Sequence, residues 1–317
     1  MRLYIASESL TLTPRVVYSY CTVSARRQLV GLIGLGNMGT AVGERLLDAG
    51  CPLVVHNRSR EKTAPLARRG AEVADTPADL AAAVDVVFTS LSDDAALEAV
   101  AGALADAARP GAILADLSTV SPPASARVAA LAERASLRYL RAPVSGNPAV
   151  VRAGNASFIV SGPREALEQV DPLLRTIGRA VLYVGDGEHA RVVKLAINLV
   201  IGGLAQLMAE ALVLGEASGV SRSALLETMG ESAAGAPFVK YKTEALLRDD
   251  YSATFTTRLM EKDLDLVLAA AEDAGVRLPL TEEIKALVRS AIDAGYGDDD
   301  FMALFPHLQN AGDRAAV

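Results

Sequence analysis

The sequence of 317 residues has no tryptophan, two cysteines and three histidines, and aromatic residues make up only 4% of it. His56, His189 and His307 are too far apart to form a metal-ligand cluster, and Cys21 and Cys51 form no C-x-x-C pair. Basic residues number 31 against 38 acidic ones, so the net charge is −7 and no basic excess is present to neutralise a phosphate backbone. We therefore expect neither a structural metal nor a nucleic-acid partner.

Long apolar runs are missing as well. The most apolar stretch extends from Leu195 to Ala209 and contains Asn198 and Gln206, whereas a membrane span needs about 18 to 20 apolar residues. We interpret this stretch as a buried helix and expect no membrane partner. A single disulfide would add little to a chain of this length, so the cysteine usage suits a reducing compartment and predicts a cytoplasmic protein.

The first 28 residues differ in composition from the rest. They contain four arginines, one acidic residue, many serines and threonines, and no apolar segment of the kind that a secretory signal requires. This composition loosely matches an organellar transit peptide. An unstructured leader or a misassigned start codon explains it equally simply, so we exclude residues 1–28 from the fold.

Composition and patterning together predict an α/β domain followed by a helical one. Hydrophobic residues make up 51% of the chain and charged residues 22%, as in an ordinary globular protein. From residue 29 short apolar runs alternate with amphipathic stretches, which is typical of βαβ units with a parallel sheet. The expected strands are 29–33, 53–56, 86–91, 113–116, 137–142, 157–161 and 180–184. Beyond Gly187 the expected elements are helices at 188–217, 222–231, 237–248, 257–274, 281–295 and from 299.

The change of pattern predicts the domain boundaries, with a nucleotide-binding domain at 29–187 and an all-helical domain at 188–317. Helix 188–217, roughly 45 Å long at about 1.5 Å per residue, joins the two. Gly202 and Gly203 in its middle indicate close approach of another helix, for instance from a second subunit. Thr76 and Ser121, each followed by proline, are expected to cap helices at their N-termini.

A glycine-rich turn lies between the first expected strand and the first expected helix. It matches G-x-G-x-x-G, in which one glycine permits the tight turn, one lets the backbone approach a pyrophosphate, and one allows close helix packing. The anion would lie at the helix N-terminus. This context predicts a dinucleotide site formed by Gly34, Leu35, Gly36, Asn37, Met38 and Gly39.

The end of the second strand indicates which dinucleotide binds. An Asp or Glu there would accept a hydrogen bond from the ribose 2′-hydroxyl and repel a 2′-phosphate, but this chain has Asn57, Arg58, Ser59 and Arg60. A guanidinium binds phosphate in a bidentate manner, so the sequence favours NADP(H) over NAD(H). The alternative is that Arg58 and Arg60 form a solvated helix start.

Lys194 and Asn198 are candidates for the chemical step. They are four residues apart at the start of the long helix and therefore share a face. A lysine beside a cofactor cleft can donate a proton to a carbonyl, and an adjacent amide can hold a substrate oxygen. The spacing fits equally well a lysine that extends its amine into water and an amide that caps a backbone group.

Two loops and one further lysine could reach the same cleft. Thr119 follows a predicted strand in Asp-Leu-Ser-Thr, at the edge where ligands bind in open α/β sheets, although the segment could equally initiate a helix. The amides of Ser145 and Gly146 could form an anion-binding nest for a carboxylate, or a simple turn. Lys262 lies in a charge run that fits a solvated helix face.

Together these motifs resemble the β-hydroxyacid dehydrogenase family, which includes 3-hydroxyisobutyrate dehydrogenase, tartronate semialdehyde reductase and glyoxylate/succinic semialdehyde reductase. The resemblance extends from Leu29 to about Leu308. It depends on five motifs that occur in the expected order: Gly-Leu-Gly-Asn-Met-Gly at 34–39, Asp-Leu-Ser-Thr at 116–119, Ala-Pro-Val-Ser-Gly at 142–146, Lys194 with Asn198, and Lys-Asp-Leu at 262–264.

The resemblance implies a Rossmann domain joined to a helical domain, a hydride transfer between a short hydroxyacid and its aldehyde, and assembly as dimers or tetramers. The preference for NADP(H) comes from residues 57–60 and not from the resemblance. It assigns the acid/base role to Lys194, the binding of a small carboxylate-bearing substrate to Ser145, Gly146 and Asn198, and contact with the nicotinamide to Thr119 and Lys262. Where the family has Ser-Gly-Gly this chain has Asn147 in third place, which puts the usual substrate range in doubt.

Three other functions compete with this interpretation. An imine reductase resembles the same scaffold but usually has another residue in place of Lys194. A 6-phosphogluconate dehydrogenase is longer than this chain and has a histidine after its lysine, where this chain has Ile197 in the segment. A non-catalytic dinucleotide-binding protein would have no need of a proton donor together with Asn198 and Ser145.

Overall fold

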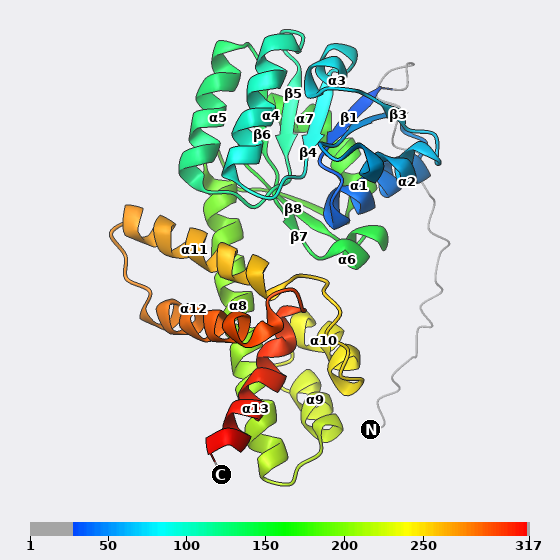
Figure 1. Cartoon of the computed structure of the whole chain (residues 1–317). Coiled ribbons are helices and arrows are strands. Elements are labelled where there is room, and N and C mark those ends of the chain that lie inside the picture. Colours follow the sequence, from blue (N-terminus) through cyan, green and yellow to red (C-terminus); the bar gives the residue numbers. More distant parts are fainter. Residues whose placement is uncertain (1–27, 316–317) are drawn as a thin grey trace, which may run out of the picture.

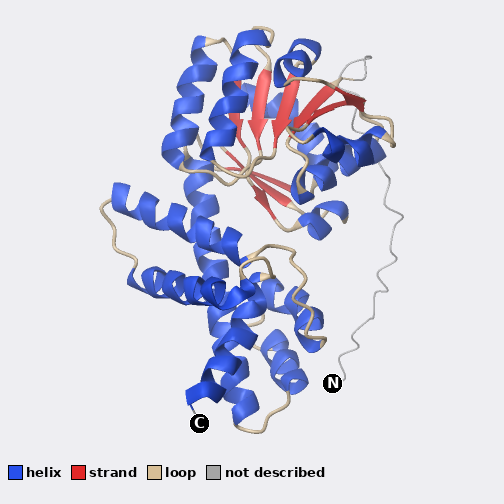
Figure 2. Ribbon diagram, in the orientation of Figure 1, coloured by secondary structure: helices blue, strands red, loops and turns tan. Residues whose placement is uncertain are grey.

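The computed structural model describes residues 28–315, which form an α/β lobe and a helical lobe connected by one long helix (Figure 1). Strands occur only in the first lobe among these residues, as Figure 2 shows. The predicted fold class, a Rossmann domain with a parallel sheet followed by a helical domain, is confirmed. The expectations for residues 1–27 lie outside the described part of the chain.

The larger sheet is parallel and has the order β3-β2-β1-β4-β5-β6. Its strands are β1 (Val30–Ile33), β2 (Leu53–His56), β3 (Glu72–Val73), β4 (Val86–Thr89), β5 (Ile113–Asp116) and β6 (Arg138–Arg141). The strand order reverses between β1 and β4, and ligands of open α/β sheets bind outside the carboxyl ends of the strands at such a point. Only β3 was not predicted, because its two residues are too few to show alternation.

Helices cover both faces of this sheet, and each face has its own core. Leu46 of α1 and Leu174 of α7 contribute to one core, and Leu80 of α3, Leu97 of α4 and Val128 of α5 to the other. The bounds are α1 (Asn37–Asp48), α2 (Ala64–Ala67), α3 (Pro77–Ala83), α4 (Asp94–Ala107), α5 (Pro122–Arg134) and α7 (Arg164–Ile177), with a 3₁₀ turn η1 (Arg60–Thr63).

The predicted helix caps are confirmed. The Thr76 side chain accepts a hydrogen bond from the Asp79 amide at the start of α3. The Ser121 side chain does the same for the Ala124 amide at the start of α5. In both helices proline occupies the first turn, where its missing N–H costs nothing.

The last strands do not continue the parallel sheet. β7 (Val144–Ser145), β8 (Ser157–Val160) and β9 (Ala180–Tyr183) form a separate sheet of three strands, in which β7 runs antiparallel to β8. The expectation of a single parallel sheet is therefore wrong for these strands. The chain turns back after β6, and Gly146, at φ +137, leads from β7 into the short helix α6 (Pro148–Arg152).

The helical lobe is built around α8 (His189–Ala217), whose bounds agree with the predicted interdomain helix. The other elements are α9 (Arg222–Glu231), α10 (Pro237–Leu247), α11 (Thr257–Asp273), α12 (Pro279–Ala291), η2 (Ile292–Tyr296), η3 (Phe301–Ala303) and α13 (Leu304–Ala315). A Cβ on Gly202 would lie 3.2 Å from Met260 Sδ, so the helix that approaches closely there is α11 of the same chain.

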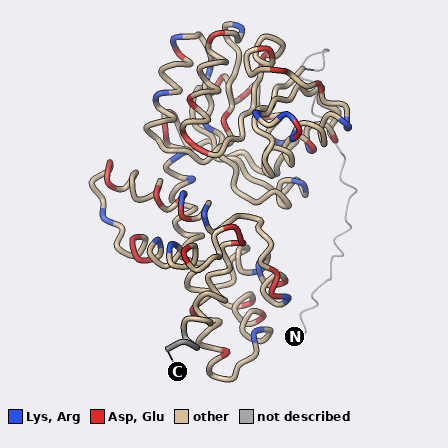
Figure 3. Tube along the Cα trace, in the orientation of Figure 1, with Lys and Arg blue, Asp and Glu red and all other residues tan. Residues whose placement is uncertain are grey.

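α8 is not buried on all sides, contrary to the expectation from its composition. It is long and apolar enough to cross a membrane by length and composition, and 39% of its most apolar window is buried. Val192, Val200, Leu207 and Leu214 are exposed along it, Leu214 by 70%. Lys and Arg are interspersed with Asp and Glu over both lobes (Figure 3).

Cys51, which is buried just before β2, is disulfide-bonded. This bond differs from the expectation based on cysteine usage. The cellular compartment stays a prediction.

Candidate active site

The glycine turn connects β1 to α1 at the carboxyl edge of the sheet. Gly34 has φ +93, and a Cβ there would lie 2.2 Å from the Ser90 carbonyl oxygen. A Cβ on Gly39 would lie 1.9 Å from the Gly34 carbonyl oxygen. Both positions therefore require glycine for the turn itself, before any ligand is considered.

Gly36 differs from these two because nothing lies within 4 Å of a Cβ built on it. It is the N-cap of α1 and provides no side chain to cap the helix. Asn37 beside it is exposed and Met38 is partly buried, whereas Leu35 is in the core. The open helix N-terminus, with its unpaired amides and positive end of the helix dipole, fits the pyrophosphate of a dinucleotide.

The residues after β2 lie beside the glycine turn. The Asn57 side chain accepts a hydrogen bond from the Leu35 amide at 2.8 Å and donates one to the Ser59 carbonyl at 2.9 Å. It therefore ties its own loop to the glycine turn. Arg58 is exposed, and no hydrogen bond or ion pair to another described residue holds it, whereas Arg60 pairs with Asp75.

A hydrogen bond between the two lobes joins Lys262 to Thr119. The Lys262 amine, on α11, donates a hydrogen bond of 2.9 Å to the Thr119 carbonyl oxygen, on the loop after β5. Lys262 is thus not simply part of a solvated helix face. The two residues expected near the nicotinamide meet at the carboxyl edge of the sheet.

The predicted carboxylate site follows β6. Ser145 is partly buried in β7 and Gly146 is exposed beside it, in a conformation that favours glycine. The side chain of Asn147 caps α6, because its oxygen accepts a hydrogen bond of 3.0 Å from the Val150 amide. Asn147 also lines a cavity of about 400 Å³ between α6 and α10, whose other walls include Tyr241 and Lys242.

Lys194 and Asn198 share one face of α8, as predicted. Asn198 is buried and donates a hydrogen bond of 2.5 Å to Asp263 of α11. Lys194 is partly buried, and the loss of solvation lowers its pKa below that of an ordinary lysine. The negative charge of Asp263 raises this pKa and the positive charge of Lys262 lowers it, and both effects are smaller than that of burial.

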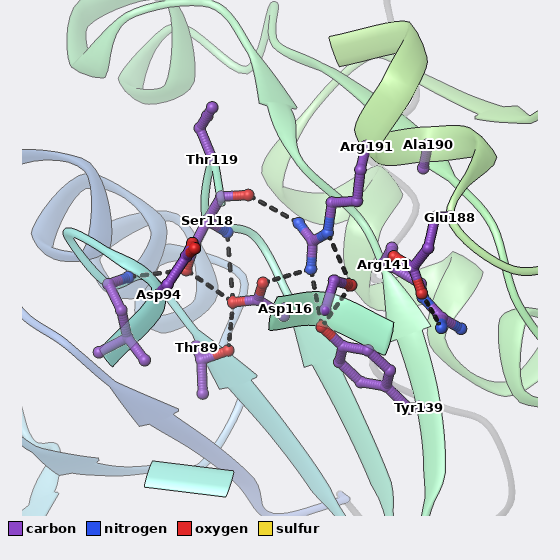
Figure 4. A network of polar contacts seen from close by, with 12 residues as sticks. Thr89, Asp94, Asp116, Ser118, Thr119, Tyr139, Arg141, Glu188, Ala190 and Arg191 are labelled. Atoms are coloured by element: carbon purple, nitrogen blue, oxygen red, sulfur yellow. Dashed lines mark hydrogen bonds and ion pairs between the residues drawn. The ribbon is translucent and has the colours of Figure 1, made fainter. Parts of the chain in front are cut away.

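Two residues of the site were missed by the sequence analysis. Asp263 is buried and joins the helix that carries Lys194 to α11. Arg191 is 1% exposed and links α8 to the loop before Thr119, as Figure 4 shows. The sequence signal for Arg191 was its charge at an otherwise apolar position of the helix, three residues before Lys194.

This arrangement has the features of a nicotinamide-dependent oxidoreductase. An open helix N-terminus for a dinucleotide lies at the switch point of a Rossmann sheet, and a partly buried amine lies on the helix that joins the lobes. The two parts of the site come from different lobes, and the contact between Lys262 and Thr119 connects them.

Comparison with known proteins agrees with this class. Residues 29–185 match the model for the NAD binding domain of 6-phosphogluconate dehydrogenase, and residues 187–308 match that for NAD-binding of NADP-dependent 3-hydroxyisobutyrate dehydrogenase. The 3-hydroxyisobutyrate dehydrogenase of Pseudomonas aeruginosa is 32% identical over 87% of this chain and 96% of its own.

Solved structures extend the comparison to three dimensions. The 3-hydroxyisobutyrate dehydrogenase of Mycobacterium tuberculosis, solved with L-serine, superposes with a TM-score of 0.81 at 27% identity, over 89% of this chain and 99% of that one. The protein Psf3, solved with NADP+ and 2-OPP, has a TM-score of 0.81 at 28% identity, over 88% and 99% of the two chains.

The chain belongs to the β-hydroxyacid dehydrogenase family. It is an enzyme that uses a nicotinamide dinucleotide to oxidise or reduce its substrate.

The glycine turn leads to a test that separates folding from ligand binding. We expect Gly36→Ala to leave the melting temperature unchanged but to weaken NADPH binding at least about tenfold, because the added methyl occupies the space of the pyrophosphate. Gly39→Ala should lower both the melting temperature and the affinity for NADPH, because its methyl would clash with the Gly34 carbonyl oxygen. Fluorescence titration with NADPH and thermal unfolding measure the two quantities. Unchanged NADPH affinity in Gly36→Ala would contradict the assignment of this turn.

Proposed function

We propose that this enzyme interconverts a short 3-hydroxyacid, or a related hydroxyacid, and its aldehyde with NADP(H), and that Lys194 is the general acid/base. The observation that carries the proposal is the position of Lys194. Lys194 is partly buried on the helix between the lobes, lies on the same face as Asn198, and is close enough to Asp263 and Lys262 for their charges to act on its amine.

When bound, the dinucleotide supplies or accepts the hydride. During aldehyde reduction the Lys194 ammonium would protonate the oxygen as negative charge develops on it. The amides of Ser145 and Gly146 and the free part of the Asn198 amide would hold the substrate carboxylate and orient its carbonyl. During oxidation the neutral Lys194 amine would take the hydroxyl proton.

The role of Lys194 is tested by substitution and by pH. Since general acid catalysis is worth about 10² to 10⁴ in rate, Lys194→Ala should lower kcat by that factor and leave NADPH affinity unchanged. Burial lowers the pKa of Lys194, so kcat for reduction should fall as pH rises through a value below the about 10.4 of an ordinary lysine. Lys240→Ala, at an exposed lysine of α10, is the control. Wild-type kcat in Lys194→Ala would exclude the role.

The preference for NADP(H) depends on Arg58. Its exposed guanidinium stands after β2 with no carboxylate at the strand end, and Ser59 is next to it. A charged hydrogen bond to the 2′-phosphate is worth about 1.5 to 3 kcal/mol, or roughly 10- to 100-fold.

Arg58→Gln should therefore lower kcat/KM for NADPH about 10- to 100-fold and leave kcat/KM for NADH nearly unchanged. Arg69→Gln, which removes another arginine of the same lobe, should change neither. The proposal fails if kcat/KM of the wild-type enzyme with NADH equals or exceeds kcat/KM with NADPH. Steady-state assays with both cofactors decide the matter.

Lys194 also favours a hydroxyacid over an imine as substrate, because imine reductases of this scaffold usually have another residue in its place. An NADPH oxidation assay with a panel of small aldehydes and cyclic imines separates the two activities. A chain that binds NADPH but oxidises it with neither class of substrate would be a dinucleotide-binding protein without turnover.

We also propose that the enzyme is a dimer or a tetramer assembled through α8. Val200, Leu207 and Leu214 follow each other at intervals of seven residues and are exposed. This spacing produces one apolar stripe along a helix, and a second copy would present the same stripe. The opposite face of α8 packs on α11 and α13.

Leu207→Glu should therefore convert the assembly to monomers, because it places a charge in the stripe. Leu280→Glu, at an equally exposed leucine that begins α12 away from this stripe, should leave it intact. Light scattering after size exclusion measures the mass. A monomeric wild-type protein would rule out the assembly.

A further inference from the structure

We propose that Arg191 is a positioning residue for the proton transfer: its guanidinium holds the loop before Thr119 against the first turn of α8 and thereby sets where Lys194 stands relative to the nicotinamide site. The inference rests on the function proposed above for Lys194. It gives Arg191 no contact with substrate or cofactor.

The guanidinium of Arg191 reaches from the helix into the sheet edge of the other lobe. It donates to Asp116 Oδ2 at 2.5 Å, to the Ser118 carbonyl at 2.7 Å, to the Tyr139 hydroxyl at 2.8 Å and to Ser125 Oγ at 3.1 Å (Figure 4). These partners belong to β5, the loop after it, β6 and α5. One side chain of α8 therefore contacts four segments of the nucleotide-binding lobe.

Asp116, which binds Arg191, also binds the neighbouring strand and the loop. Its other oxygen, Oδ1, accepts hydrogen bonds of 2.6 Å from Thr89 Oγ1 on β4 and from Ser118 Oγ. Ser118 Oγ in turn accepts from the Leu91 amide at 2.8 Å. The loop that leads to Thr119 is thus held by the side chains of Asp116 and Arg191 and by the backbone amide of Leu91.

Two cations from the helical side bind consecutive carbonyls of this loop. Arg191 of α8 binds the carbonyl of Ser118, and Lys262 of α11 binds that of Thr119. The hydrogen bond between Asn198 and Asp263 connects the same two helices. Lys194 lies between Arg191 and Asn198 on α8, so these contacts fix the segment of the helix that carries its amine.

Attachment of α8 to the first lobe does not itself require Arg191. Arg141 of β6 forms a second buried ion pair, with Glu188 at the N-cap of α8. Its guanidinium lies over the Tyr139 ring, 4.6 Å from the ring centre, and among the described residues it forms no hydrogen bond or ion pair with residues 116–119. The particular contribution of Arg191 is to hold the 116–119 loop in one conformation. Its planar group presents donors in a fixed fork, which lysine cannot reproduce.

Arg191 stays protonated in this environment. Burial alone would lower its pKa, but Tyr139 and Asp116 outweigh that effect and raise it. The pKa of Tyr139 is raised by burial, so its hydroxyl stays neutral and accepts the hydrogen bond. Arg191 therefore keeps its charge, and Tyr139 stays neutral, throughout the pH range of an assay.

The test compares Arg191→Lys with Arg141→Lys, two matched changes of buried arginines near the start of α8. Both should lower the melting temperature. Only Arg191→Lys should lower kcat, by about 10- to 100-fold, because a displacement of about 1 Å at a reacting group can cost that much. The dissociation constant of NADPH, measured by fluorescence, should stay within about threefold of the wild-type value.

A second readout distinguishes positioning from loss of stability. If Arg191→Lys loosens the first turn of α8, the Lys194 amine becomes better hydrated and its pKa rises. The high-pH fall of kcat should then move to higher pH, although the other charges that act on Lys194, those of Asp263 and Lys262 on α11, are unchanged. Arg141→Lys should leave the pH profile in place.

Tyr139→Phe provides a milder variant in case Arg191→Lys does not fold. It removes one acceptor of Arg191 and leaves no charge unpaired, and kcat should fall several-fold in the same direction. The inference is overturned if folded Arg191→Lys or Tyr139→Phe keeps the wild-type kcat and pH profile, or if Arg141→Lys lowers kcat equally. If Lys194→Ala keeps the wild-type kcat, the proposed function fails instead, whatever the arginine variants show.

Discussion

The ion pair between Arg191 and Asp116 is the interaction on which the two-lobe site depends. Each lobe has its own apolar core, so most of the apolar packing stabilises the lobes from within. A buried ion pair contributes little net stability, because desolvation offsets the attraction, but removal of one partner costs about 3 to 5 kcal/mol. Such a pair is therefore better at enforcing one geometry than at stabilising the fold.

α8 carries three residues of the candidate site. Arg191, Lys194 and Asn198 occur at intervals of three and four residues and share one face of the helix. Arg191 fixes that face to the nucleotide-binding lobe, and Asn198 fixes it to Asp263 of the helical lobe. The amine between them needs no hydrogen bond of its own to be well placed. A lysine is flexible, so the precision has to come from its helix.

Much of the fold could be predicted because its elements have strong local signals. The parallel strands are short apolar runs, and Thr76 and Ser121 begin helices with their usual capping chemistry. The separate small sheet could not be predicted, because β8 and β9 look like any buried strand and only the turn after β6 decides where they pair. The partners of Arg191 were equally hidden, since 75 residues separate it from Asp116.

The candidate site was predictable to the extent that its chemistry is local. The glycine turn and the shared face of Lys194 and Asn198 follow from spacing alone, and Thr119 was expected from its place after a strand. That Lys262 binds the Thr119 carbonyl depends on how two lobes meet, which no local pattern encodes. For this reason the sequence indicates a class of reaction rather than one substrate.

The charges around Lys194 suit a group that must work in both directions. A general acid is most effective when its pKa lies near the working pH, because it then both holds and releases its proton readily. Burial moves the pKa of this amine downward, toward that range, and Lys262 acts in the same sense. Asp263 opposes both and keeps the ammonium form accessible. Because Asp263 also binds Asn198, the same carboxylate that raises the pKa of the proposed proton donor also orients the amide one turn further along α8, and one contact between α8 and α11 affects both position and charge.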